Sequence, residues 1–261
     1  MAAREEVSAW RPQVPGVTEV FHAHFTEHAY PMHVHDVWTL LIVDTGAVRY
    51  DLGRHACGTL HETVSLLPPH VPHNGSPATP EGFRKRVLYL DTSVLDPALI
   101  GSAADTPDFT DPLLRRRVGQ LHGVLAHPGD EFEAESRLAF VGERLREHLR
   151  ARFEPTPERR DVAGRFRDLL DARDLQGVTL KEAAQILHAH PAHLVRAFST
   201  AYGLAPHQYL TARRVERARA LLLDGLPPAE AATSAGFYDQ AHLGRHFKRI
   251  VGVPPGRFRG Q

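Results

Sequence analysis

The sequence predicts a two-domain α+β protein, with an N-terminal all-β barrel, a helical hairpin as linker, and a C-terminal all-α domain in which a long helix joins two helix-turn-helix units. Three observations in the 261 residues predict this architecture. Short runs rich in β-branched and aromatic residues come first, which is typical of strands. Two apolar stripes at helical spacing follow. A seven-residue segment near the C-terminus then occurs twice, 49 residues apart, and such repeats mark a duplicated supersecondary unit.

The N-terminal part alternates short apolar runs with turn signals such as Asp44-Thr45-Gly46, which predicts an all-β sandwich or barrel. The expected strands are Thr18–Phe21, Val37–Val43, Ala47–Leu52, Val64–Leu67 and Phe83–Leu90. Because successive residues of a strand face opposite sides, alternate ones line an interior that can hold one small ligand. The candidates for its walls are Trp38, Leu40, Ile42, Tyr50, Leu66, Phe83 and Tyr89.

Two short motifs in this part resemble those of the cupin barrels. His33-Val34-His35 resembles the first motif, and Pro69-His70-Val71-Pro72-His73 resembles the second. The resemblance implies that His73 lies across the barrel from the other two, and three imidazoles are a ligand set that Zn²⁺, Ni²⁺, Mn²⁺ or Fe²⁺ accept. Metal-binding cupins have a glutamate where this sequence has Thr39, and His70 replaces a glycine of the second motif.

We therefore expect these histidines to be structural or to contact an organic ligand. No cofactor is expected, and a divalent metal held by His33, His35 and His73 is the alternative. The resemblance to such barrels implies that the interior serves as a pocket for a small-molecule effector. The expected contacts in this effector pocket are His35, Trp38 and Tyr50.

Two apolar stripes after the barrel predict an antiparallel helical hairpin, with Pro128-Gly129 between its helices. The stripes are Leu114, Val118, Leu121 and Leu125, then Leu138, Val141, Leu145 and Leu149. Their heptad-like spacing favours pairing of the hairpin with its twin in a homodimer, although packing onto the barrel within one subunit leaves the same stripes. Prolines and charges over 154–160 then indicate an interdomain linker.

Each copy of the C-terminal repeat predicts a helix, a turn and a second helix. In the first copy Thr179 and Glu182 form a capping box, and Pro191 suits the first turn of the next helix. In the second copy Gly236 supplies the turn and Asp239 an N-cap. The first helix of the first copy carries an apolar stripe of Leu180, Ala183, Ala184 and Leu187. A helix of about 18 residues, which begins at Pro206, joins the copies and spans about 27 Å.

The repeated heptads are Ala192–Phe198 and Ala241–Phe247, and in each a leucine and a phenylalanine four residues apart turn inward. The histidine and arginine between them must then face outward. Two helices joined by a tight turn, the second exposing such side chains, are typical of a DNA-reading helix-turn-helix, since arginine can donate two hydrogen bonds to guanine. The alternative is a pair of helical hairpins with solvated outer faces, which the duplication makes the weaker interpretation.

Gly236–Arg259, GFYDQAHLGRHFKRIVGVPPGRFR, resembles the C-terminal signature of the AraC/XylS family of bacterial transcription regulators. The resemblance extends from about Asp161 to Arg259. It implies that the base-reading residues are Ala192, His193, Arg196, Gln240, Ala241, His242 and Arg245. The expected phosphate contacts, which position a protein without specifying sequence, are Lys248, Arg249 and Arg257.

Charge and cysteine content agree with a DNA partner inside a cell. The chain has 31 basic and 31 acidic residues, yet residues 161–261 contain 14 Lys and Arg against 9 Asp and Glu. A modest basic surplus in one domain favours a specific duplex binder over a nonspecific coating protein. With the single cysteine Cys57 and no apolar run long enough for a membrane, we expect a soluble cytoplasmic protein with no membrane partner.

The sequence therefore predicts an effector-sensing barrel at 1–98, a hairpin at 99–153, a linker at 154–160 and a DNA-binding domain at 161–261. The expected function is that of a sequence-specific transcription regulator, activator or repressor, which binds double-stranded DNA and an unknown small-molecule effector and is not an enzyme. RNA polymerase is an expected partner if it activates. The alternatives are a metal-responsive regulator and a metal-dependent cupin enzyme fused to a DNA-binding domain, the latter disfavoured by Thr39.

Overall fold

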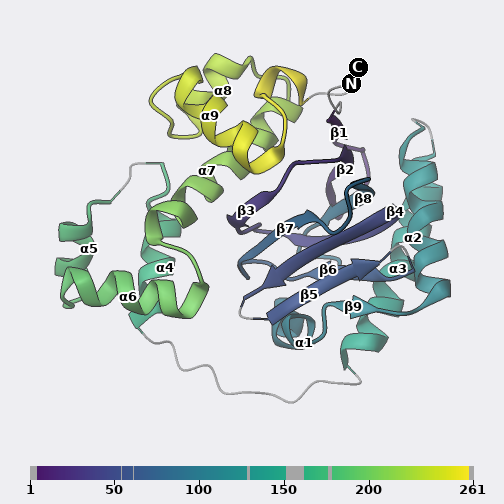
Figure 1. The fold of residues 1–261 in the computed structure, drawn as a ribbon, viewed down its shortest axis with the longest axis horizontal. Helices are drawn as coiled ribbons and strands as arrows, with labels where there is room; N and C mark the ends of the chain where they lie inside the picture. Colours follow the sequence, from purple (N-terminus) through teal and green to yellow (C-terminus); the bar gives the residue numbers. More distant parts are fainter. Residues whose placement is uncertain are drawn as a thin grey trace.

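The computed structural model has three parts in the predicted order: a β barrel, a helical hairpin and a helical C-terminal domain (Figure 1). It describes residues 5–53, 55–60, 62–127, 130–150, 162–175 and 178–258. The expected linker at 154–160 lies outside these residues. Over the described ranges, no helix combines the length and the apolar character that crossing a membrane requires.

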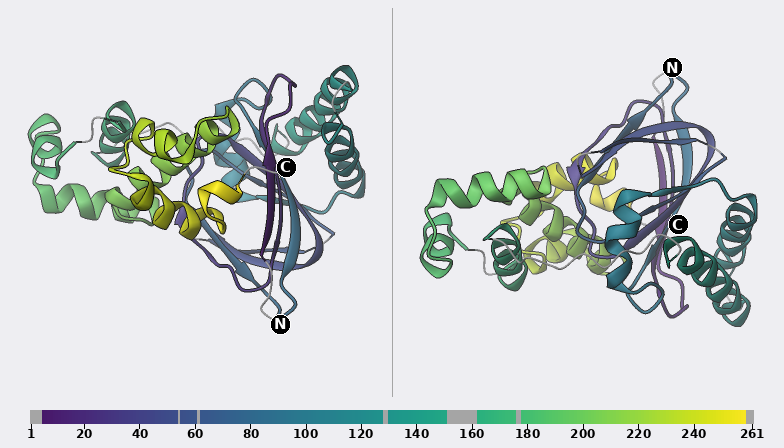
Figure 2. Two further views of the ribbon diagram at one scale, coloured as in Figure 1. Left: turned by 90° about the horizontal axis from the view of Figure 1, so that it is seen from above. Right: turned by 90° about the horizontal axis from the view of Figure 1, so that it is seen from below.

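The barrel consists, in the described part of the chain, of nine strands that all pair antiparallel. They are β1 (Glu6–Trp10), β2 (Val17–Phe25), β3 (Tyr30–His33), β4 (Trp38–Leu52), β5 (His55–Leu60), β6 (Val64–Leu67), β7 (His73–Pro77), β8 (Phe83–Leu90) and β9 (Asp108–Phe109). One sheet has the order β1-β2-β8-β4-β6-β9. The other consists of β3, β7, the second half of β4 and β5. Figure 2 shows the two sheets facing each other across the barrel interior.

Strand β4 corrects the expected turn at Asp44-Thr45-Gly46. The strand continues through these residues, and its register against β8 shifts between Val43 and Thr45, which is a β-bulge. Gly46 has a φ of 74°, and a Cβ there would lie 2.0 Å from the carbonyl oxygen of Gly82. The residues that resembled a turn instead bend one strand from the first sheet into the second, as bulges do at barrel corners.

The alternation of β4 separates two apolar cores. Leu41 and Val43 face the barrel interior, where they belong to one core with Phe21, Phe83 and Tyr89. Trp38, Leu40 and Ile42 face the outside, where they belong to a second core with the hairpin. The expected interior walls Trp38, Leu40, Ile42 and Leu66 are therefore wrong, because the strand register turns them toward the hairpin.

The hairpin forms as expected, from α2 (Pro112–Leu125) and α3 (Glu131–Arg150), after the short helices η1 (Pro97–Leu99) and α1 (Ile100–Asp105). Every residue of the two predicted stripes is buried, with at most 6% of its surface exposed. The stripes pack on each other and on the outer face of the first sheet, in one core with Leu40 and Leu66. The favoured pairing of these stripes with a twin is thus wrong: the barrel of the same subunit already covers them.

The C-terminal domain contains α4 (Val162–Ala172), α5 (Leu180–Ile186), α6 (Pro191–Tyr202), α7 (Pro206–Leu223), α8 (Pro228–Ser234), α9 (Gln240–Val251) and the 3-10 turn η2 (Pro255–Arg257). Helix α7 has 18 residues and joins the two helix-turn-helix units, as predicted. It lies against the barrel, and α9 contacts β3 (Figure 1). The first unit also contacts the barrel rim, since Val34 is buried in one core with Leu194 and Phe198.

Candidate DNA-binding surface and effector cavity

The first helix-turn-helix unit is built by the local signals in its sequence. The hydroxyl of Thr179 accepts from the backbone N–H of Glu182 at 3.2 Å, and the Glu182 carboxylate accepts from the N–H of Thr179 at 2.8 Å, which completes the capping box. His188, with a φ of 49°, ends α5, and α6 begins at Pro191. Leu180 departs from the expected apolar stripe, since 39% of its surface is exposed.

In α6 the predicted inward pair, Leu194 and Phe198, is fully buried. His193 and Arg196 are exposed, as a base-reading role requires. The side chain of Ala192 lies outside the described part of the structure.

The second unit repeats this arrangement. Gly236 has a φ of 82° in the turn, and the Asp239 carboxylate caps α9 by accepting from the backbone N–H of His242 at 2.6 Å. Leu243 and Phe247 are fully buried. The base-reading candidates Gln240, Ala241 and Arg245 are exposed, and His242 is half-buried.

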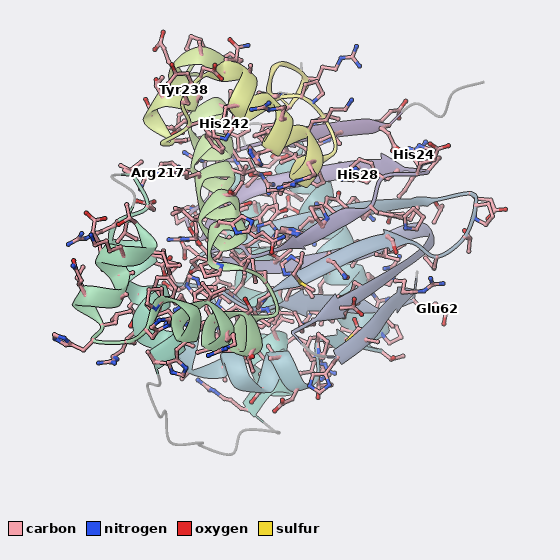
Figure 3. All side chains as sticks on the ribbon, turned by 60° about the vertical axis from the view of Figure 1, so that its left-hand side comes forward. His24, His28, Glu62, Arg217, Tyr238 and His242 are labelled. Carbon is pink, nitrogen blue, oxygen red and sulfur yellow. The ribbon has the colours of Figure 1, made fainter. Side chains whose placement is uncertain are left out.

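The phosphate-contact candidates Lys248, Arg249 and Arg257 are also exposed. Sequence reasoning did not single out Tyr238, which precedes the N-cap of α9 and has 88% of its surface exposed. Figure 3 shows Tyr238 together with His242 on the second unit. A large aromatic side chain that remains in solvent beside a recognition helix is a candidate contact for DNA, and its only signal in the sequence was its place in the turn.

The barrel interior contains a cavity of about 50 Å³ between the two sheets. Two of the expected effector contacts, His35 and Tyr50, line it; the third, Trp38, does not, because it faces the hairpin and donates its indole N–H to the carbonyl of Leu95. The mouth of the cavity is closed by the DNA-binding domain, through Arg219 of α7 and Ile250 and Val251 of α9. The cavity is therefore shared between the two domains.

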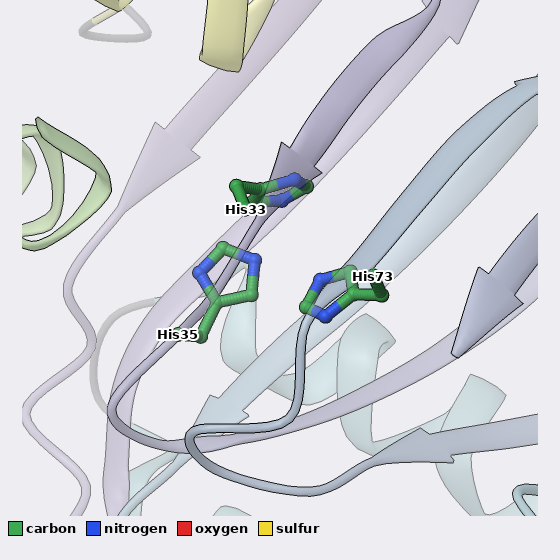
Figure 4. A group of neighbouring side chains, drawn as sticks. All are labelled: His33, His35 and His73. Atoms are coloured by element: carbon green, nitrogen blue, oxygen red, sulfur yellow. The ribbon is translucent and has the colours of Figure 1, made fainter. Parts of the chain in front are cut away.

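His33, His35 and His73 meet in this cavity, as the cupin resemblance implied (Figure 4). Each is 4% exposed, and one ring nitrogen from each lies within 4.8 Å of the others. Burial lowers the pKa of His73 to about 3, and it also holds the pKa of His33 well below its usual value. Both rings are therefore neutral at physiological pH. Thr39, at the position of the missing glutamate, also lines the cavity.

A buried ionic network ties the mouth of the cavity to α7. Arg219, 3% exposed, contacts the carboxylate of Glu19 on β2 and donates to Glu216 one turn earlier on α7 at 2.9 Å. Glu216 in turn pairs with Nδ1 of His35 at 2.9 Å. The guanidinium also lies 4.5 Å from the ring centroid of Tyr89, in cation–π contact.

Two carboxylates share this one guanidinium, and their pKa values separate accordingly. Burial raises the pKa of Glu19 to about 7, despite the neighbouring Arg219. Burial opposes ionisation of Glu216 too, but Arg219 and His35 outweigh it and lower its pKa to about 2. At neutral pH Glu216 is therefore the ionised partner of His35. Sequence reasoning had assigned no role to Glu19, Glu216 or Arg219.

Lys85 is a second cavity residue that sequence reasoning missed. Its ammonium lies 4.1 Å from the ring centroid of Tyr30, and burial, followed by the charge of Arg219, lowers its pKa to about 7. On β8 it occurs in the run Arg84-Lys85-Arg86, which is typical of a solvated strand end. Strand alternation places Lys85 on the same face as Phe83, Val87 and Tyr89, which belong to the interior core, and this alternation was the signal in the sequence.

Comparison with known proteins assigns both halves of the chain. Residues 15–140 match the model of the AraC-like ligand binding domain, and residues 183–261 match that of a helix-turn-helix domain. The uncharacterized HTH-type transcriptional regulator YbfI of Bacillus subtilis is 24% identical over 228 residues, which are 82% of this chain and 81% of that protein. The HTH-type transcriptional regulator MtrA of Neisseria gonorrhoeae is 40% identical over 70 residues, 26% of this chain and 23% of that protein.

Solved structures share the whole architecture. Apo ToxT K231A from Vibrio cholerae superposes with a TM-score of 0.62 at 10% identity, over 97% of this chain and 96% of that one. Wild-type ToxT bound to an unsaturated fatty acid gives a TM-score of 0.58 at 12% identity, over 97% and 92% of the two chains. At such identity the likeness concerns the fold. With the two domain models, which together span both domains, and a relative matched over 81% of its length, the chain therefore belongs to the AraC family of DNA-binding transcription regulators, with a ligand-binding domain before its helix-turn-helix domain.

Proposed function

We propose that this regulator reads a promoter through the outer faces of α6 and α9 and that an effector in the barrel cavity tunes this binding. One observation carries the first part: the two units bury equivalent leucine and phenylalanine pairs and expose Arg196 and Arg245 at equivalent positions. Each arginine is then free to donate two hydrogen bonds to a guanine in the major groove.

The closed cavity supports the second part. An effector changes DNA binding only if it binds one arrangement of the domains better than another. Because Arg219 of α7 and Ile250 and Val251 of α9 line the cavity, an occupant can act on the helix that joins the two units and on the second recognition helix, directly or through a neighbouring side chain. ToxT, which shares the fold, has been captured with an unsaturated fatty acid, and by analogy we place the effector of this chain in the N-terminal domain. We assign the barrel no catalytic role.

We further infer that the protein acts in the bacterial cytoplasm, where promoters are found. RNA polymerase remains a predicted partner if the protein activates transcription. A homodimer also stays a prediction, and its interface must lie elsewhere than on the apolar stripes of α2 and α3, which the barrel covers.

Selection of duplexes from fragments of the source genome tests the function. The full chain should enrich a defined operator. Arg196→Ala and Arg245→Ala should each weaken its binding by about 1–3 kcal/mol and relax the preference at different bases, about one helical turn apart.

Lys248→Ala is the matched control for charge: it should weaken all sequences alike and flatten the salt dependence. Unchanged affinity and preference in both arginine variants would show that α6 and α9 are not the reading helices.

A further inference from the structure

We propose that His33, His35 and His73 bind a divalent transition metal ion and that this ion is the effector of the regulator. The inference rests on the proposed function and identifies the chemical class of the effector. Within the described residues, these three side chains are the group that is close enough to share an ion. They come from β3, from the loop after it and from the start of β7, so that the barrel closure brings them together (Figure 4).

The polar contacts of the three rings are all made by Nδ1, which leaves Nε2 of each ring available. Nδ1 of His33 lies 2.7 Å from the carbonyl of Pro31, Nδ1 of His73 lies 3.1 Å from that of Val71, and Nδ1 of His35 lies 2.9 Å from the Glu216 carboxylate. A carbonyl oxygen and a carboxylate only accept, so each Nδ1 must carry the proton. Nε2 is then the ring nitrogen left for a metal ion, and this outer support by carbonyls and a carboxylate is the pattern that orients histidine ligands of metals.

The dimensions suit an ion with a water ligand. A tetrahedral ion with bonds of about 2.05 Å needs nitrogens about 3.3 Å apart, so rings now within 4.8 Å would each close in by less than about 1 Å. The cavity of about 50 Å³ is far smaller than the pockets of roughly 300–1,000 Å³ that hold organic ligands. Three imidazoles with room for water favour Zn²⁺ and its neighbours over Mg²⁺ or Ca²⁺, which prefer oxygen.

The charges around the site are compatible with a dication. The positive charge of Arg219 is matched by Glu19 and Glu216, and the ammonium of Lys85 is directed over the Tyr30 ring. Glu216 reaches the site only through His35. The carboxylate that supports the metal ligand therefore comes from the DNA-binding domain.

This cross-domain contact gives the ion a route to the DNA. An ion bound to Nε2 of His35 also strengthens the contact between His35 and the Glu216 carboxylate, because metal binding makes Nδ1–H a stronger donor. Glu216 and Arg219 lie on α7, which joins the two helix-turn-helix units. Metal binding thus favours the arrangement in which α7 closes the barrel. Glu216 is in this sense a positioning residue that couples the ion to DNA binding.

Metal binding by the full chain tests the site. Zn²⁺ titrated by calorimetry and Co²⁺ followed by its visible spectrum should each show one ion per chain, with a Co²⁺ spectrum of nitrogen ligands. His33→Gln and His73→Gln should weaken binding by at least about 100-fold, more than the loss of an outer-shell partner does. His24→Gln, on the outer side of β2, is the matched control and should bind as wild type.

Without metal, the two ligand variants should show a cooperative thermal transition as the wild type does, which would show that they fold. Zn²⁺ should raise the thermal midpoint of the wild type and of His24→Gln but not that of the two ligand variants. Equal Zn²⁺ binding by wild type and both ligand variants, or no stoichiometric ion in the wild type, would overturn the metal site.

Operator binding tests the coupling. Zn²⁺ should change the operator affinity of the wild type by about 5–150-fold, the usual range for coupled sites. Glu216→Gln should still bind Co²⁺, about 10–100-fold more weakly, but at saturating Zn²⁺ its operator affinity should no longer respond. A merely structural role of Glu216 would lower stability and leave the Zn²⁺ response intact, and that result would overturn the coupling.

The metal inference and the proposed function can be contradicted separately. If the wild type selects an operator but His33→Gln and wild type respond alike to Zn²⁺, the metal inference is wrong and the regulator stands. If no operator is selected with or without metal, the proposed function itself is wrong.

Discussion

Arg219 shows how much depends on a single buried side chain. It is 3% exposed, contacts two carboxylates, and stacks on Tyr89, so burial, ion pairing and cation–π contact all act on one guanidinium. The planar fork of arginine suits such a site better than lysine does. Because Glu19 and Arg219 are 200 residues apart, this network exists only when the barrel and α7 are docked.

Asp111 has a similar role at the base of the hairpin. One carboxylate oxygen caps α2 by accepting from the N–H groups of Leu113 and Leu114, at 2.9 and 3.0 Å. The other accepts from Arg144 and His148 of α3, both at 2.8 Å. Burial alone would raise the pKa of Asp111, but the hydrogen bonds outweigh it and hold the pKa well below its usual value.

We therefore expect Asp111→Asn to lower the free energy of unfolding by about 1–3 kcal/mol at pH 7. A lowered folded-state pKa stabilises the fold above the unfolded pKa of about 4, and this contribution is lost as pH falls below that value. The gap between wild type and variant in urea denaturation should thus persist at pH 5 and narrow below about pH 4.

Asp105→Asn, at an exposed site at the end of α1, is the control and should leave stability within about 0.5 kcal/mol at each pH. A gap for Asp111→Asn that widens with acid would contradict the interpretation.

At the scale of elements, the hairpin shows that an apolar stripe predicts a buried helix face but not the surface that packs against it. The spacing of the leucines correctly predicted two antiparallel helices. The same spacing fits packing on a twin hairpin or on a sheet. The apolar residues of β4 and β6 that face outward from the barrel decide between the two, because the hairpin stripes pack on them and bury them.

Leu121→Ala should consequently behave as a core truncation, although the residue is on a helix at the periphery of the barrel. Its side chain is fully buried in the core with the first sheet, and we expect a loss of about 2–5 kcal/mol in the free energy of unfolding. Leu113→Ala on the same helix, at a site 37% exposed, is the matched control and should cost far less.

Chemical denaturation at several protein concentrations distinguishes the two packings. A loss that depended on protein concentration would indicate that the stripe pairs between subunits after all.

For the whole molecule, the relevant feature is the contact of both helix-turn-helix units with the barrel. Val34 joins the core of the first unit, and Gly252 at the end of α9 lies against Phe25. Gly252 ends its helix with a φ of 95°, and a Cβ there would lie 2.7 Å from the Phe25 ring. Gly252 therefore has two roles: it terminates α9, and it permits the close approach of α9 to the barrel.

Gly252→Ala should therefore loosen the docking of α9 on the barrel. The positive φ and the contact with the fully buried Phe25 ring predict that the free energy of unfolding falls by about 1–3 kcal/mol. Hydrogen exchange should accelerate in β3, which α9 contacts, and stay unchanged in the distant hairpin α2–α3.

Gly256→Ala in η2, where a Cβ would meet nothing within 4 Å, should change neither the free energy of unfolding nor the hydrogen exchange of β3. Unaltered β3 exchange in Gly252→Ala would indicate that the contact does not hold the domains together.

The sequence by itself determined the two helix-turn-helix units, the helix that joins them and the outward position of Arg196 and Arg245. These features depend on spacing within one helix, on the capping box at Thr179 and on Gly236, all of which act over a few residues. It also located three histidines from two short motifs.

Tertiary structure alone decided which face of β4 points inward, what covers the hairpin, and that Glu216 reaches His35 from another domain. A bulge at residues 43–45 and the closure of the barrel fix the first two, and docking of α7 fixes the third. Such contacts join residues far apart in the chain, so no local pattern contains them, and only the packing of the whole chain brings them together.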